Sequence, residues 1–544
     1  MDREHSWEEI AIQKRKRRDS LIPEAWQLRS TYPPGSNVLD VPRTCGILTH
    51  TELSITSDYD AVDLVQRMKE GLLSCEAVTV AFCKRAAIAQ QLTNCLTEIF
   101  FDLAIERAKH LDAERKTNPS KSLGPLFGLP ISLKDSFNLP GIDTTIGLTY
   151  FANKPVTETS TLAEILLELG AILYCKTNVP QSVMTVDSDN HIFGRTVNPA
   201  NTKFTAGGSS GGEGALIAMR GSVLGVGTDI GGSIRMPALC CGIYGLKPCA
   251  YLLSYRRKRS PVHPGFLGHP PSVGPMATSA RACRYFLEVV MKAEPWRRDG
   301  NCYRLPWQPG TEDISLRRLR VGVVASVGGF SVTPPMRRAL QESSEKLSQA
   351  GHTVIPIELP DVAGLERSFK GSFALDGNEY LKELLAATGE PPVPSVKAIG
   401  ILDGQPMPLK DILDINASRA YYLQLYNDLW ETHNLDLIML PPAPHTAIPH
   451  DAWQFIVYTG IWNFVDCPAM VLPVGAVDER DVLDDRSQFG ELDEAYYSLY
   501  TGPEKYRGVP ISVQLVAQRY NDQGLAMMAE HVDRILNGGE CSSS

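Results

Sequence analysis

From about residue 124 onward, short apolar runs alternate with amphipathic segments, and this alternation limits the folds open to the chain. Apolar runs of about four to eight residues are typical of buried strands, whereas apolar residues spaced three and four apart are typical of helices. Strands that alternate with helices predict an α/β fold, a layered sheet with helices on both faces. The expected strands are 129–133, 171–175, 321–325, 354–355, 437–440, 470–472 and 511–516.

Capping residues and stop signals predict helices around these strands. We expect one helix over 161–169, ended by a glycine, and another over 334–350 that begins with two prolines. Upstream, Ser57 or Asp58 is expected to cap one helix and Ser74 the next.

Residues 1–44 have a different character, a polar helical arm followed by a proline-rich connection. No break in composition follows, so we expect a single domain over residues 45–540.

The charge of the chain argues against nucleic acid as a partner. The net charge is −9, and the two short basic runs, Lys14–Arg18 and Arg256–Arg259, carry no interleaved aromatic residues. We expect both runs to be solvated surface.

Other sequence signals predict a cytoplasmic protein without a metal or another cofactor. No apolar run approaches the roughly 18 residues of a membrane span, and the amino terminus lacks the apolar segment of a secretory signal. The 12 cysteines are scattered without a CxxC pair, which favours reduced thiols, and the 11 histidines show no HExxH spacing.

Lys134 ends the apolar run 129–133. Burial disfavours a charged amine and lowers its pKa, so a lysine in this position can act as a general base near neutral pH. Taken alone, a lysine in this position more often reaches solvent from a strand edge.

Two glycine-rich segments follow, and each presents serine. The first, residues 207–214, reads GGSSGGEG and contains Ser209 and Ser210. The second, residues 225–237, presents Ser233 among successive backbone N–H groups, which can hold an oxyanion beside a nucleophile. A P-loop is excluded because no GxxxxGK[ST] occurs, and the dinucleotide motif GxGxxG fails at its third glycine. The elbow GxSxG fits 207–212 formally but is a weak signal.

Together these segments resemble the amidase signature family. The resemblance is carried by GLPISLKD at 128–135, GGSSGG at 207–212 and GTDIGGSIR at 227–235, and it covers most of the chain. Residues 6–9 and 81–94 look closer still to fungal acetamidases.

The resemblance implies a layered α/β/α fold with a central mixed β-sheet and an amidase that uses a Ser-Ser-Lys triad and an acyl-enzyme. In that triad Ser233 would be the nucleophile, Ser209 the bridging serine and Lys134 the base. The oxyanion would be held by the backbone N–H groups of Ile230, Gly231, Gly232 and Ser233. The supporting residues would be Ser210, Asp229 and Arg235.

The substrate stays open between a short aliphatic or aromatic amide and a larger amide of specialised metabolism. We expect a small-molecule amide as the partner, no nucleic acid and no membrane, with a homodimer possible because related enzymes are often dimers. The pocket walls are expected from 370–470, with Trp453, Tyr458, Trp462 and Phe464 among them. Three rival functions are a Ser-His-Asp esterase using His445 or His450, a glutaminase-type amidotransferase subunit, and a nucleotide-binding module.

Overall fold

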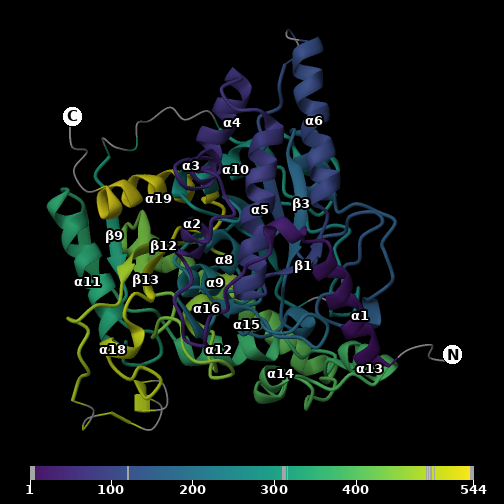
Figure 1. Ribbon diagram of the computed structural model, residues 1–544. Helices are drawn as coiled ribbons and strands as arrows, with labels where there is room; N and C mark the ends of the chain where they lie inside the picture. Colours follow the sequence, from purple (N-terminus) through teal and green to yellow (C-terminus); the bar gives the residue numbers. More distant parts are fainter. Residues whose placement is uncertain are drawn as a thin grey trace.

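A mixed sheet forms the centre of the molecule in the computed structural model (Figure 1). The structure describes residues 6–538 except 119, 121, 267, 309–313, 315–316, 486, 488, 491–492 and 495–496. Within these residues, eleven strands pair in the order β1-β3-β2-β6-β8-β7-β12-β13-β11-β9-β10. Four pairs near the two ends of this strand order are parallel: β3/β2, β2/β6, β11/β9 and β9/β10. The pairs between them, from β6 to β11, are antiparallel. The predicted α/β fold with a central mixed sheet is confirmed.

The strands of this sheet are short. They are β1 (Leu96–Ile99), β2 (Pro130–Lys134), β3 (Ile172–Thr177), β6 (Leu224–Asp229), β7 (Tyr244–Lys247), β8 (Ser272–Ala277), β9 (Arg320–Val323), β10 (Thr353–Pro356), β11 (Leu437–Leu440), β12 (Ala469–Ala476) and β13 (Pro510–Val516). A separate two-stranded sheet consists of β4 (Val197–Asn198) and β5 (Asn201–Thr205).

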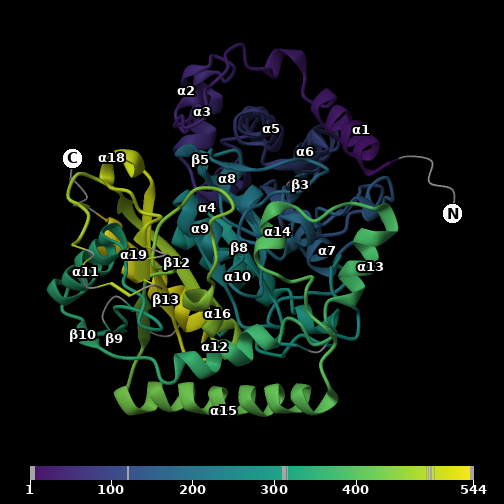
Figure 2. The same ribbon diagram turned by 90° about the horizontal axis from the view of Figure 1, so that it is seen from below.

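Helices flank the sheet. In the amino-terminal half they are α1 (Trp7–Ser20), α2 (Val41–Thr44), α3 (His50–Ser57), α4 (Ala61–Glu70), α5 (Cys75–Thr93), α6 (Phe101–Thr117), α7 (Thr161–Glu168), α8 (Gly211–Ala218) and α9 (Arg235–Cys241). Later in the chain come α10 (Ala280–Lys292), α11 (Pro334–Gln349), α12 (Val362–Gly371), α13 (Glu379–Thr388), α14 (Pro394–Ala398), α15 (Leu409–His433), α16 (Val457–Phe464), α18 (Pro503–Tyr506) and α19 (Asp522–Asn537). Figure 2 shows α15 along the side of the molecule opposite α2, α3 and α5.

All seven strands expected from apolar runs are present, and six of them lie within about two residues of their predicted ends. The seventh, β12, continues to Ala476, four residues past the predicted end at 472. Strands β2, β3, β6 and β8 are buried at every position. Because successive side chains of a strand point to opposite faces, both faces of this part of the sheet are covered. The helices over 161–168 and 334–349 and the cap at Ser74 are confirmed.

The predicted cap at Ser57 or Asp58 is wrong. Ser57 ends α3, and the Asp60 side chain accepts from the backbone N–H groups of Val62 and Asp63 at the start of α4. Ser57, Asp58 and Asp60 are all residue types that can cap a helix, but only Asp60 has the extended backbone geometry of an N-cap residue.

The basic run in α1 is solvated only in part, contrary to expectation: Lys16 and Arg17 are exposed, but Lys14 and Arg18 are not. Lys14 is buried and pairs with Glu98 and with Asp143, at 2.9 Å from the latter. Arg18 is buried as well and donates to the backbone oxygen of Leu96 at 3.0 Å. These contacts fasten the arm to β1, and the division at residue 44 stays a prediction.

Strands β2 and β6 are parallel neighbours, with Leu133 opposite Val226. Their carboxyl ends therefore meet at one edge of the sheet, where β2 ends in Lys134 and β6 in Asp229. Ligand sites of open α/β sheets commonly lie at such an edge.

Within the described residues, no helix is both long and apolar enough to cross a membrane.

Candidate active site

Lys134 is completely buried at the end of β2. Its Nζ lies 2.7 Å from Ser209 Oγ and 2.9 Å from Thr228 Oγ1. Burial lowers the pKa of Lys134 to about 7, although the negative charges of Asp229 and Glu213 oppose this effect. The amine is therefore substantially uncharged at neutral pH and in direct contact with one of the two predicted serines.

Glu213 is a second buried ionisable group behind Lys134. Its carboxylate accepts from Ser132 Oγ at 2.6 Å and from Thr177 Oγ1 at 3.0 Å. Burial raises the pKa of Glu213 to about 7, against the effects of these hydrogen bonds and of Lys134. A Cβ at Gly225 would lie 2.0 Å from Glu213 Oε2, so the glycine makes room for this carboxyl group.

The loop with Ser209 and Ser210 is held from two sides. The Ser210 N–H donates to the Ser233 carbonyl at 3.1 Å, which joins the two glycine-rich segments. On the other side Ser188 Oγ donates to the Gly207 carbonyl and accepts from the Gly211 N–H.

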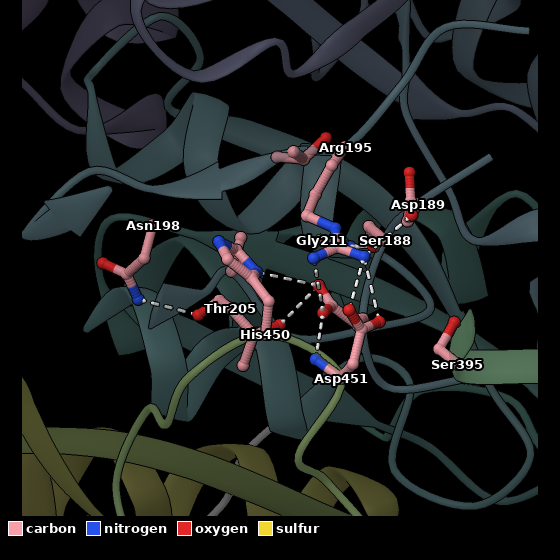
Figure 3. A network of polar contacts seen from close by, with 12 residues as sticks. Ser188, Asp189, Arg195, Asn198, Thr205, Gly211, Ser395, His450 and Asp451 are labelled. Atoms are coloured by element: carbon pink, nitrogen blue, oxygen red, sulfur yellow. Dashed lines mark hydrogen bonds and ion pairs between the residues drawn. The ribbon is translucent and has the colours of Figure 1, made fainter. Parts of the chain in front are cut away.

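A polar network supports the same loop from behind (Figure 3). Asp187 accepts from Thr205 Oγ1 at 3.1 Å and from the Asp451 N–H at 2.8 Å, and His450 Nδ1 lies 3.4 Å from its carboxylate. Arg195 bridges Asp189 and Asp451. The network fixes the segment that enters the loop with Ser209.

The turn after β6 carries Ser233 on the half-exposed rim of the site. The Asp229 carboxylate accepts from the Gly232 N–H at 2.8 Å and from the Ile234 N–H at 3.0 Å. Gly232 has φ 133°, and a Cβ there would lie 2.3 Å from Thr459 Oγ1. The Gly232 N–H is thus bonded to Asp229 within the turn, although the family resemblance implied that it would donate to the oxyanion.

The other three expected donors are free of such a bond. The N–H groups of Ile230, Gly231 and Ser233 have no acceptor among the described residues. Three unpaired N–H groups in one turn form a concave donor surface for an anion.

Asp229 and Arg235 form an ion pair that is entirely buried, with Nη2 and Oδ1 2.9 Å apart. Burial alone would raise the pKa of Asp229, but Arg235 and then Lys247 and Asn463 hold it well below its usual value. The Arg235 guanidinium also donates to Asn463, Gln514 and the Thr459 carbonyl. Both residues brace the turn and stand outside the cavity lining.

Ser209 and Ser233 line one cavity of about 550 Å³. This volume lies within the range of about 300–1,000 Å³ typical of small-molecule sites. Most of its wall comes from described residues between Tyr251 and Pro271. The range 370–470 contributes Tyr380 and Arg419. The expected wall residues Trp453, Tyr458, Trp462 and Phe464 are instead buried in the hydrophobic core.

A family model described as Amidase matches residues 77–526. The chain belongs to the amidase family. The amidase is 36% identical to an acetamidase of Emericella nidulans over 98% of each chain. It is also 36% identical to an acetamidase of Aspergillus oryzae, over 98% of this chain and 99% of the relative.

Among solved structures, fatty acid amide hydrolase superposes on this amidase with a TM-score of 0.93 and 29% identity, covering 98% of this chain and 95% of the other. The resemblance to the amidase signature family and to fungal acetamidases is confirmed, and the enzyme is a hydrolase of amide C–N bonds.

The histidines named for a rival Ser-His-Asp site lie elsewhere in the amidase. His445 is buried, with Nδ1 2.8 Å from the Thr446 carbonyl and its ring against Trp453, and His450 belongs to the network of Asp187. Two other histidines line the cavity, His263 and His269, and the Nε2 of His269 lies 2.7 Å from the Ile230 carbonyl. Burial lowers the pKa of His269 to about 4. Its position indicates a support for the turn.

Three further residues at the site were missed by the sequence analysis. Thr228 was passed over because alternation from the Leu133–Val226 pair puts Thr228 and Lys134 on opposite faces of the sheet. Only the folded strand ends bring Lys134 Nζ within 2.9 Å of Thr228 Oγ1. Lys258 and Arg259 were expected in a solvated run, but both line the cavity. A proline-rich loop has no helical or strand periodicity from which one could predict that these two side chains face the cavity.

Within the described part of the chain, no group of three or more His, Cys, Asp or Glu is placed to hold a metal ion.

Proposed function

We propose that this amidase hydrolyses amides through an acyl-enzyme on Ser233, with Ser209 as the proton relay and Lys134 as the base. The observation that carries the proposal is the 2.7 Å contact between Lys134 Nζ and Ser209 Oγ, made by a lysine whose pKa burial lowers to about 7. An uncharged amine has one lone pair and two N–H donors. It can accept the Ser209 proton while it donates to Thr228 Oγ1 at 2.9 Å.

The acylation step follows from this arrangement. Lys134 takes the proton of Ser209, which takes the proton of Ser233 as Ser233 Oγ bonds to the carbonyl carbon of the substrate. The electron pair of the C=O bond moves onto its oxygen. We assign the stabilisation of that oxyanion to the N–H groups of Ile230, Gly231 and Ser233, each worth about 2.7–4 kcal/mol in the transition state.

Collapse of this intermediate breaks the C–N bond. The proton on Lys134 returns through Ser209 to the leaving nitrogen, so ammonia or a neutral amine departs rather than an anion. Water then attacks the acyl-enzyme by the same route and releases the acid and Ser233.

The relatives named acetamidase favour a small primary amide as substrate. A cavity of about 550 Å³ also accepts a larger acyl group, so the larger amide of specialised metabolism remains the second candidate.

Ammonia release from acetamide, butyramide and benzamide tests the proposal, with wild type compared to alanine variants of the triad. Ser233→Ala should lose at least about 10⁴-fold in kcat, and Lys134→Ala and Ser209→Ala a comparable factor, because residues that act as a unit fail together. Ser348→Ala, at an exposed serine of α11, is the matched control and should match wild type. Retention of wild-type kcat by Ser233→Ala would refute the assignment.

A further inference from the structure

The cavity next to Ser209 and Ser233 is lined by basic side chains without a compensating acid. Lys258, Arg259 and Arg419 line it, and none of its described lining residues is Asp or Glu. Low-dielectric walls concentrate the field of such charges, so the site attracts a negatively charged group.

Lys258 lacks a polar partner. Its Nζ is buried and makes no hydrogen bond to any described residue. It lies 3.7 Å from the ring centroid of Tyr255 and 4.9 Å from that of Phe137. Ring faces attract an ammonium group but accept none of its three N–H groups in an ordinary hydrogen bond.

The backbone fixes the position of Lys258 relative to the site. Lys258 pairs with Phe137 in an antiparallel bridge, and the Arg259 N–H donates to the Ser136 carbonyl at 2.9 Å. Phe137 stands three residues after Lys134. The basic loop is therefore attached directly to the end of β2, beside the reactive groups.

Neighbours in the same basic run behave differently. Arg257 pairs with Glu164 at 2.7 Å, and Arg256 donates to the Arg298 carbonyl at 2.8 Å. Neither belongs to the cavity lining. The run thus divides into two arginines with partners outside the cavity and two basic residues, Lys258 and Arg259, that line it.

We propose that the amide substrate of this enzyme carries a carboxylate, which Lys258 binds inside the cavity with Arg259 and Arg419 contributing to the field. This inference rests on the proposed function, because it assigns the substrate class of the same site. Burial, and to a lesser extent Lys134, lowers the pKa of Lys258. A bound carboxylate supplies the counter-charge that the protein itself does not provide and favours the protonated amine.

Two matched pairs of amides test the proposal and separate the two positions that the carboxylate can take. On the acyl side, 4-carbamoylbenzoate is compared with 4-methylbenzamide. On the amine side, N-benzoylglycine is compared with N-propylbenzamide. Binding is measured by calorimetry on Ser233→Ala, so the result does not depend on turnover.

In at least one pair the carboxylate should bind about tenfold or more tightly than its neutral partner, as expected for a hydrogen-bonded charge. Lys258→Met in the Ser233→Ala background should remove this preference while leaving the neutral amide within about threefold, and Lys258→Arg should keep it. Arg257→Met is the matched control and should leave all affinities unchanged.

Equal affinity within both pairs, or no measurable binding of either carboxylate, would overturn the proposal. A loss at Lys258→Met that is equal for charged and neutral amides would also overturn it. Failure of the proposed function is recognised separately, as amide turnover that persists in Ser233→Ala.

Discussion

Replacement of Lys134 by methionine should abolish activity and yet stabilise the folded protein near pH 7. Burial lowers the pKa of this lysine from 10.5 to about 7, and each tenfold change in an acid constant corresponds to about 1.4 kcal/mol. Near pH 7 the unfolded chain is protonated at this site and the folded protein is half protonated. The lysine therefore reduces the free energy of unfolding by about 4 kcal/mol there.

Lost contacts offset part of this gain. Methionine cannot bond Ser209 Oγ or Thr228 Oγ1, and each lost hydrogen bond costs about 1 kcal/mol. Lys134→Met should thus raise the free energy of unfolding near pH 7 by about 2 kcal/mol.

The difference should also depend on pH with a defined sign. The folded-state pKa is depressed, so between about pH 7 and 10.5 the unfolded chain binds the proton more strongly and the penalty falls as pH rises. By about pH 9.5 the penalty is roughly 1 kcal/mol, and wild type should equal or slightly exceed the variant.

Urea unfolding of both proteins across this pH range measures the difference. Lys116→Met, at an exposed lysine of α6, is the control and should stay within about 0.5 kcal/mol of wild type at every pH. A variant less stable than wild type near pH 7, or a difference independent of pH, would refute a buried lysine with a strongly lowered pKa.

Three other perturbations test the site. Asp229→Asn leaves Arg235 buried without its counter-charge, so the free energy of unfolding should fall by about 3–5 kcal/mol in urea titrations, and a loss below about 1 kcal/mol would count against the pair. Gly232→Ala places a Cβ 2.3 Å from Thr459 Oγ1 and should lower kcat by displacing the turn, whereas unchanged kinetics would contradict that packing. In wild type, log kcat/KM should fall on the acid side with a midpoint near pH 7 as Lys134 becomes protonated, and a profile flat from about pH 5 to 9 would exclude a lysine base.

Much of the fold was predictable from the sequence because buried strands require apolar runs. The runs at 437–440 and 511–516 became β11 and β13, and Ser74 caps α5 as its position before an amphipathic segment indicates. Helix starts with several candidate caps were less certain, as the shift from Asp58 to Asp60 shows, because only backbone geometry selects among them.

Long-range polar contacts were the part that the sequence could not reveal. Lys14 and Lys258 stand in short basic runs that are usually solvated, but Lys14 meets acids on distant segments and Lys258 faces a cavity. Likewise the Gly232 N–H was counted as an oxyanion donor, and its bond to Asp229 depends on the folded turn. Residue type and local pattern carry no information about such partners.

The central claim, that Ser233 forms the acyl bond, is tested most directly by mapping a covalent adduct. Wild-type enzyme treated with a fluorophosphonate and digested should carry the label on the peptide with Ser233, and tandem mass spectrometry should place it on that side chain. Ser233→Ala should take up no label, while Ser210→Ala should still be labelled at Ser233. Label on Ser209 or Ser210 of the wild-type enzyme would contradict the account.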